Sequence, residues 1–310
     1  MRNVAPYIRR GFTLIELLVV MGILVLLAVL TGISVSQISK EARLSSGVNQ
    51  VVAALGGARA YAIQNNVTVL LAFVVKVDEA AVSEGERVEM VLAESTGEMY
   101  PIFDDNYLFE ERYSPVPGFS FAELPRGIKV AGPLSAVAYA DDAPGEDGLW
   151  ATQPGGEWQL EAGRIYTREP GRMIGVMFSS DGTLITRNVR GAGGSGSTVW
   201  PFIDFNRDGV ANIVGVGNNY SGSYQYVVYD AVGDEVDLHP VQWLAVFDDE
   251  ALREARNPAN WVPASGNAPS GGQVTAQDER RISDVTNWVE SAGVPIFFNR
   301  YTGVAEVSRP

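Results

Sequence analysis

The sequence is organised around one stretch near its N-terminus, Gly11-Phe12-Thr13-Leu14-Ile15-Glu16-Leu17-Leu18-Val19-Val20. This stretch opens an apolar run that extends to Ile33, and Glu16 is the one charged residue within the run. A carboxylate at the centre of a membrane-spanning helix costs about 2.5–3.5 kcal/mol, and less near a helix end. Glu16 lies near the start of the run, so the energetic cost of placing its carboxylate in a membrane is low enough to be tolerated. As the charged residue in an apolar run, it is a candidate functional residue.

A short basic leader precedes the apolar run. Residues 1–11 contain Arg2, Arg9 and Arg10 and no acidic residue. As a helix, residues 12–33 would span about 33 Å, enough for a bilayer core of roughly 30 Å. Basic residues ahead of a span favour a cytoplasmic N-terminus. We therefore predict a leader at 1–11, a single transmembrane segment at 12–34, and a head on the other side of the membrane.

Two other interpretations of this N-terminus stay open. An ordinary signal peptide would be cut after the apolar region, but no clear small-x-small cleavage site follows that region. In a plain signal anchor Glu16 would have no role, and the energy of the carboxylate alone does not exclude this.

The residues from Arg10 onward, Arg-Gly-Phe-Thr-Leu-Ile-Glu-Leu-Leu-Val-Val, closely resemble the class III signal sequence of type IV pilins and type II secretion pseudopilins. The resemblance implies that a prepilin peptidase cuts between Gly11 and Phe12 and methylates the new N-terminus at Phe12. Glu16 then becomes the fifth residue of the mature chain, the position that the family keeps acidic.

Cleavage at Gly11 would create an ammonium group at the membrane interface. A charge in an apolar environment needs a partner of opposite sign. In the family's filaments, the amine is paired with the glutamate of its own or a neighbouring subunit. The resemblance thus implies that Glu16 serves assembly, and polar groups in apolar interfaces are best attested as devices that set register.

A stem follows the apolar run. Apolar residues recur at steps of three, four and seven, which predicts an amphipathic helix over 35–66 that ends at Gln64-Asn65-Asn66. The fold class that we predict is α+β and pilin-like. A long N-terminal α-helix (12–66), half transmembrane and half amphipathic, packs on a mainly antiparallel β-sheet head (67–310).

The head shows strand and helix signals in alternation. Branched apolar runs and turn residues predict strands at 68–77, 87–93, 127–130, 224–229 and 241–247, two strands around a turn within 172–185, and a hairpin at 295–307. Helices are predicted at 248–256 and 278–291. Residues 100–121 are interpreted as irregular with short strands, and 141–156 as a surface loop.

Two short segments resemble the GspH/FimT type of minor pseudopilin. They are the stem end from Gly57 to Asn66, with its Ala-Arg-x-x-Ala pattern, and Val-Met-Phe-Ser-Ser-Asp-Gly-Thr at 176–183. Residues 187–293 lie largely outside this resemblance, so we predict an insertion or subdomain there.

The segment at 204–212 matches the first half of a calcium-binding loop. Asp204, Asn206 and Asp208 offer oxygen ligands at alternate positions, Gly209 supplies the turn, Val210 would offer its carbonyl, and Asn212 would act through water. The twelfth position is Gly215 instead of the bidentate Glu, which Asp230, Asp234 or Glu235 could supply from a distance. The alternative is a polar hairpin turn.

Composition excludes several classes of function. The net charge of −14 argues against a nucleic-acid partner, and the chain has no cysteine and only one histidine, His239. No nucleophile motif or phosphate-binding glycine loop is present. The acid pairs Asp104-Asp105, Asp141-Asp142 and Asp248-Asp249, like His239, are interpreted as surface residues, so we predict that the chain is not an enzyme.

The sequence thus favours a structural subunit in the inner membrane, with a cytoplasmic N-terminus and a periplasmic or extracellular head. The resemblance implies assembly into a type II secretion pseudopilus or a type IV pilus, as a minor subunit. It implies as partners the prepilin peptidase, other pilins or pseudopilins, the inner-membrane assembly platform with its ATPase, and membrane lipid. The alternative is a membrane-anchored extracytoplasmic binding domain or enzyme that is not in a filament.

Overall fold

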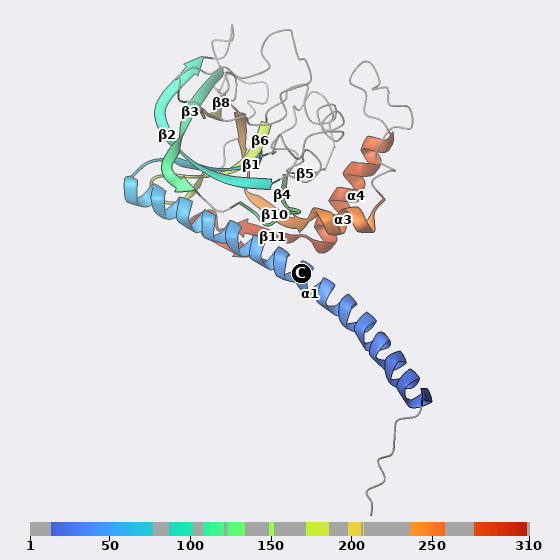
Figure 1. Cartoon of the computed structure of the whole chain (residues 1–310). Coiled ribbons are helices and arrows are strands. Elements are labelled where there is room, and N and C mark those ends of the chain that lie inside the picture. The colour runs from blue at the N-terminus through green and yellow to red at the C-terminus, as the bar shows by residue number, and fades with distance from the viewer. Residues whose placement is uncertain are drawn as a thin grey trace, which may run out of the picture. The chain divides into compact units, whose positions relative to one another are not determined.

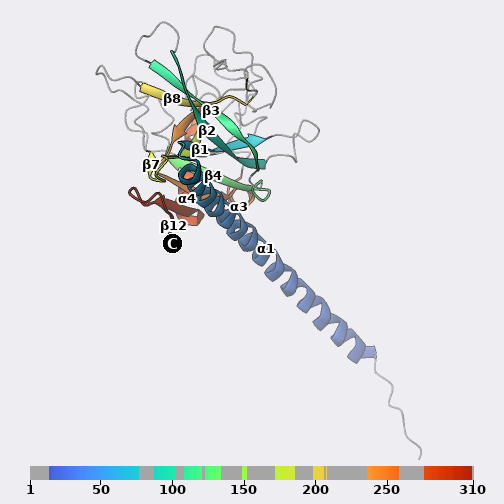
Figure 2. The same ribbon diagram turned by 90° about the vertical axis from the view of Figure 1, so that its left-hand side faces the viewer.

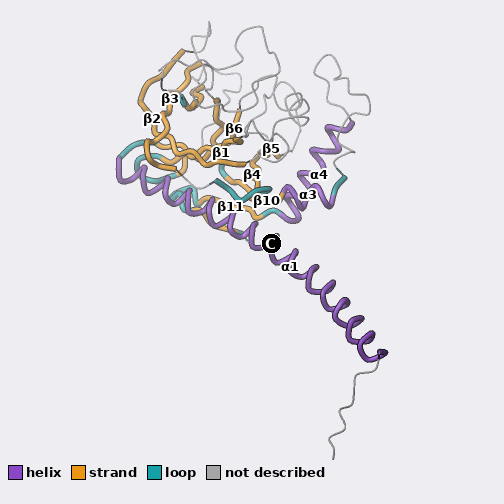
Figure 3. The backbone as a smooth tube through the Cα atoms, in the orientation of Figure 1, coloured by secondary structure: helices purple, strands orange, loops and turns teal. Residues whose placement is uncertain are grey.

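The computed structural model describes residues 14–76, 87–101, 108–120, 123–133, 149–151, 172–185, 198–205, 207, 236–257 and 276–308. The chain divides into two compact units, Met1–Arg43 and Leu44–Pro310. Helix α1 (Leu14–Asn65) contributes to both. Figure 1 shows the chain coloured from its N-terminus to its C-terminus, and Figure 3 separates its helices from its strands.

The first unit contains the apolar part of α1. Its large hydrophobic side chains from Leu14 to Leu27 are exposed by 50–83%. In the part of the chain that the structure describes, no helix is both long enough and apolar enough to cross a membrane.

The second unit begins with the rest of α1, residues 44–65, which we call the stem. The stem ends where the sequence predicts, since Asn66 adopts a positive φ of 52° and the N–H of Val67 donates to the carbonyl of Ala62 at 3.2 Å. Asparagine tolerates this left-handed conformation better than most residues. The predicted stop of the helix is therefore confirmed.

Two sheets and two further helices follow the stem. Their bounds in chain order are β1 (Val69–Lys76), β2 (Arg87–Pro101), β3 (Leu108–Ser120), β4 (Ile128–Pro133), β5 (Leu149–Ala151), β6 (Arg172–Phe178), β7 (Leu184–Ile185), β8 (Thr198–Ile203), β9 (Val236–Pro240), β10 (Trp243–Asp248), α3 (Asp249–Ala255), α4 (Ala276–Ala292), β11 (Val294–Phe298) and β12 (Ala305–Val307).

The larger sheet has the order β1-β2-β3-β8-β9-β6-β7. Because β1 pairs with both β2 and β6, the strands from β1 to β6 in this order form a closed ring. The pairs β3–β8 and β6–β9 are parallel, and the other pairs are antiparallel. The smaller sheet has the antiparallel order β12-β11-β10-β4-β5.

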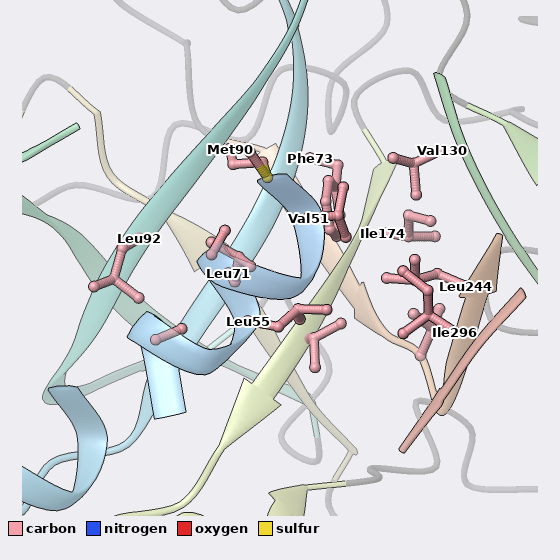
Figure 4. Packing of buried hydrophobic residues seen from close by; sticks show 14 of the residues in the cluster. Val51, Leu55, Leu71, Phe73, Met90, Leu92, Val130, Ile174, Leu244 and Ile296 are labelled. Atoms are coloured by element: carbon pink, nitrogen blue, oxygen red, sulfur yellow. The ribbon is translucent and has the colours of Figure 1, made fainter. Parts of the chain in front are cut away.

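The stem packs against both sheets in one shared core (Figure 4). Val51 and Leu55 of the stem meet Leu71 and Phe73 of the larger sheet, and Leu244 and Ile296 of the smaller sheet belong to the same cluster. A helix packed on mainly antiparallel sheets confirms the α+β, pilin-like fold class that the sequence predicts.

The opposite faces of the two sheets are also covered. In β1 the alternate residues Leu70, Ala72 and Val74 face the inside of the ring, where they meet Tyr113 and Ile203. On the smaller sheet, α3 and α4 cover the face away from the stem through a cluster that contains Phe247, Leu252, Val285 and Val289. Burial on both faces explains why β1 and β10 read as continuous apolar runs.

Most of the predicted elements that fall on described residues are confirmed. β1, the start of β2, β4, the pair β6 and β7 with its turn, β10, α3, α4 and the hairpin β11–β12 lie where the sequence places them. The predicted strand at 224–229 lies outside the described residues. Strands β8, β9 and β10 come from the range 187–293. β8 and β9 pair with strands that precede this range, and β10 pairs with one strand before it and one after it. An insertion there stays a prediction.

Two of the expectations are wrong. Residues 108–120, expected to be irregular with short strands, form the single long strand β3, and residues 149–151, expected in a loop, form β5. The prolines of β3 hid the strand from sequence reasoning. Pro115 and Pro117 lie beyond the parallel pairing with β8, which ends at Tyr113, and beside a break in register with β2. A proline is tolerated where no ladder hydrogen bond needs its missing N–H.

Candidate processing and assembly site

Of the three residues predicted to serve processing and assembly, Glu16 lies within the described residues, whereas Gly11 and Phe12 lie outside them. Glu16 is in the first turn of α1, and its side chain is exposed. The N-terminal end of a helix carries a partial positive charge that favours a carboxylate by about 0.3–1 kcal/mol. In sequence, the amine predicted to form at Phe12 lies one helical turn before this carboxylate.

Apolar side chains surround Glu16 along the helix. Leu14 is 83% exposed, Ile15 70%, Leu17 61% and Leu18 64%. Successive residues of a helix point about 100° apart, so the exposed apolar side chains from Leu14 to Leu27 together cover its whole circumference. A helix that is apolar all round suits lipid or other helices as surroundings, and a carboxylate on it suits a cationic partner.

The predicted calcium loop falls mostly outside the described residues, which leave out Asn206, Asp208, Val210 and Asn212. Asp204 is described, directly after β8, and it is fully buried. Its Oδ2 atom accepts from two nitrogens of Arg112, Nε at 2.7 Å and Nη2 at 2.6 Å. The charge of Asp204 is therefore already paired with a guanidinium of β3.

Arg112 also contacts Glu98 of β2. Burial alone would lower the pKa of Arg112, but hydrogen bonds to Glu98 and Asp204 raise it above its ordinary value. Arg207, at a positive φ of 60°, donates from Nη2 to the carbonyl of Pro115 at 2.8 Å. The start of the predicted loop is thus fixed to β3, while the calcium site itself stays a prediction.

One of the acid pairs interpreted as surface charge is buried instead. Asp248 is 6% exposed and caps α3 by accepting from the N–H of Ala251 at 3.0 Å, and Asp249 is 4% exposed. The Oδ2 atom of Asp249 pairs with Lys129 Nζ at 2.7 Å and with Arg253 Nε at 2.9 Å. The surface interpretation of this pair was therefore wrong, because the acids sit where α3 meets β4.

The other acid pairs lie outside the described residues. For His239 the structure describes only the backbone, in β9, where it pairs with Ile174 of β6. Within the described residues, no group of three or more His, Asp or Glu side chains could hold a metal ion.

Sequence reasoning missed Arg112 and Lys129. Each pairs with an acid far away in the chain, Asp204 or Asp249, and no local pattern marks such a pair. For Lys129 the sequence offers one signal, a lysine inside the otherwise apolar strand β4, since such a charge is rarely buried unless it is paired. Arg112 follows two glutamates in β3, so its sequence neighbours give no such signal.

Comparison with known proteins places this N-terminus in a known class. Residues 8–32 match the family model of the prokaryotic N-terminal methylation motif, and this range includes the predicted cleavage position and Glu16. No curated protein and no solved structure matches the chain. The match confirms the resemblance of residues 10–20 to the class III signal. The motif is the class III signal found on type IV pilin-like and pseudopilin precursors, the class that prepilin peptidase processes.

Proposed function

We propose that this protein is a structural subunit that assembles through its N-terminal helix into a type II secretion pseudopilus or a type IV pilus, as a minor subunit. Cleavage between Gly11 and Phe12 releases the leader, Phe12 becomes N-methylated, and Glu16 pairs with the new amine of its own or a neighbouring subunit. The observation that carries the proposal is the methylation motif at 8–32.

The exposed apolar helix supports the same proposal. Side chains exposed by half or more along residues 14–27 are far more apolar surface than a soluble monomer normally leaves in water. Lipid of the inner membrane covers this helix before assembly, and neighbouring pilin or pseudopilin helices cover it afterwards. The inner-membrane assembly platform is the partner that moves the subunit from the lipid into the filament. The head then faces the periplasm or the exterior.

The motif also favours a structural role over an enzymatic one. We further propose the GspH/FimT type, because the two short segments that resemble it meet in the fold. Arg59 of the first segment donates from Nε to the carbonyl of Gly182 in the second, at 3.1 Å.

Replacement of Glu16 separates processing from assembly. Glu16→Ala should be cleaved and methylated normally, yet its incorporation into filaments should fall at least about tenfold, because removal of one partner of a buried ion pair costs about 3–5 kcal/mol. The measurement is the ratio of this subunit to the other subunits in sheared, purified filaments. Leu17→Ala is the matched control, since it truncates an exposed apolar neighbour and leaves the charge in place.

Normal incorporation of Glu16→Ala would remove the role given to Glu16. If neither variant nor the native chain enters filaments in a host that makes them, the alternative holds, and the protein is an anchored binding domain or enzyme.

We also propose that the loop at 204–212 binds calcium. A ligand at 100 times its dissociation constant stabilises a fold by about 2.7 kcal/mol. Calcium should therefore raise the melting temperature of the full chain in detergent, and a chelator should lower it. Asp208→Asn should abolish the difference, whereas Glu290→Gln, a change at an exposed acid of α4, should leave it intact. A melting temperature that is indifferent to chelator would contradict the site.

A further inference from the structure

Three segments that lie far apart in the sequence meet at the C-terminal end of the stem (Figure 2). They are the last turns of α1, the turn at 179–183 between β6 and β7, and the turn at 299–304 between β11 and β12. The first turn belongs to the larger sheet and the second to the smaller sheet. This junction therefore joins the stem to both sheets outside the shared apolar core.

Arg59 is the side chain that connects the three segments. Its Nε atom donates to the carbonyl of Gly182 at 3.1 Å and to the carbonyl of Thr302 at 2.7 Å. The two acceptors are 120 residues apart in sequence and lie in different sheets. The single N–H of Nε is shared between the two carbonyls, and the charge of the guanidinium strengthens the interaction relative to a neutral donor. Arg59 therefore holds both turns against the helix.

Two glycines make room for this contact. Gly182 has a φ of +81°, and a Cβ atom there would lie 2.6 Å from Cδ1 of Ile63. Gly303 has a φ of +67°, and its Cβ atom would lie 2.1 Å from the carbonyl oxygen of Gly182. At Gly303 both the backbone conformation and the close approach of a carbonyl require glycine, whereas at Gly182 the positive φ alone does, because the exposed side chain of Ile63 can move.

Each turn is also braced from within. Asp181 accepts from the N–H of Thr183 at 3.0 Å, from the hydroxyl of Thr183 at 2.7 Å, and from the hydroxyl of Ser179. These hydrogen bonds, that of Ser179 first, lower the pKa of Asp181 to about 2. In the other turn, Asn299 Oδ1 accepts from the backbone N–H groups of Tyr301 and Thr302. Both carbonyls are therefore presented to Arg59 by preorganised turns.

We propose that Arg59, Gly182 and Gly303 form a clasp that makes the C-terminal hairpin part of the stem's attachment to the head. The end of the stem and the two turns open and close as one cooperative unit, although each belongs to a different element. The edge-to-face contact of Phe178 with Phe298, with ring centroids 6.4 Å apart, joins the strands that lead into the two turns. This inference does not depend on the proposed filament.

Hydrogen exchange of the full chain in detergent micelles, read by mass spectrometry, tests the clasp. Arg59→Gln should raise exchange about tenfold in peptides from both turns and from residues 58–65, the scale expected for the loss of a charged hydrogen bond. Peptides from β1 should not change. Arg300→Gln is the matched control, because Arg300 is exposed on the same turn as Thr302.

Gly303→Ala provides an independent variant. Its added Cβ should force the two turns apart, so exchange should rise in the turn at 179–183 as well as in its own turn. An Arg59→Gln variant with unchanged exchange in the turns would overturn the proposal. So would a Gly303→Ala variant whose effect stays within residues 299–304, or a variant that raises exchange equally in β1, since that pattern is global destabilisation.

Discussion

Gly11→Leu is expected to leave the chain uncleaved, with residues 1–11 attached and Phe12 unmethylated. The predicted cut lies directly after Gly11, and glycine lets the backbone approach a partner more closely than any residue with a side chain. Gly11→Ala adds a single methyl group and should be processed with a mild delay. The measurement is intact mass after coexpression with an active prepilin peptidase.

Gly22→Leu is the matched control for this prediction. It makes the same substitution in α1, beyond the predicted cleavage position, where an added Cβ would meet nothing within 4 Å. That variant should be cleaved like the native chain. Normal cleavage of Gly11→Leu, or loss of cleavage in Gly22→Leu alone, would contradict the assignment of Gly11.

Lys129→Met is expected to cause the largest loss of stability in the head. Lys129 and Asp249 are only 6% and 5% exposed in their side chains, and their charged atoms lie 2.7 Å apart. Removal of one partner of a buried pair costs up to about 3–5 kcal/mol, because the other charge stays buried. Arg253, whose side chain is 32% exposed, compensates the charge of Asp249 only in part. Urea unfolding of the full chain in detergent, followed by tryptophan fluorescence, measures it, since Trp243 and Trp288 pack at the edge of the adjacent core.

Two comparisons separate the cost of the buried charge from the cost of merely replacing a side chain. Arg253→Met removes the more exposed partner of the same carboxylate, and the expected loss is about 0–1 kcal/mol. The double variant Lys129→Met, Asp249→Leu should recover most of the stability, because an apolar pair of similar size avoids the buried charge. A loss under about 1 kcal/mol in Lys129→Met would show that the pair contributes little.

The same pair predicts how stability depends on pH. Burial alone would raise the pKa of Asp249, but the charges and hydrogen bonds of Lys129 and Arg253 lower it below its ordinary value. The pair therefore stabilises the fold fully above the unfolded-state pKa of about 4, and this contribution is lost progressively as the pH falls from there through the lower folded-state pKa. The difference between the native chain and Lys129→Met should shrink in that acidic range.

The sequence predicts those parts of the fold that depend on local chemistry. The end of the stem is marked by Asn65-Asn66, the start of α3 by the acids at 248–250, and the turn between β6 and β7 by Ser-Asp-Gly. In each case the residue that marks the position either makes a local hydrogen bond through its side chain or adopts the backbone φ that the boundary needs. The N-terminal motif is a local signal of the same kind, and it is confirmed as far as the family model reaches.

Long-range pairing was beyond sequence reasoning. The prolines of β3 mark irregular structure unless its neighbours in the sheet are known, and β8 and β9 become strands through parallel partners far away in the chain. The partners of charged side chains are equally hidden when they lie far away in the sequence. Nothing near Lys129 in the sequence shows that Asp249 lies beside it, and nothing near Arg59 shows that two turns from different sheets present their carbonyls to it.

The central claim is that cleavage after Gly11 and methylation of Phe12 create a new N-terminus. The most direct test is the intact mass of the protein purified from a host with an active prepilin peptidase. The account predicts a chain that starts at Phe12 and carries the added mass of one methyl group. A chain that keeps residues 1–11 under those conditions would contradict it.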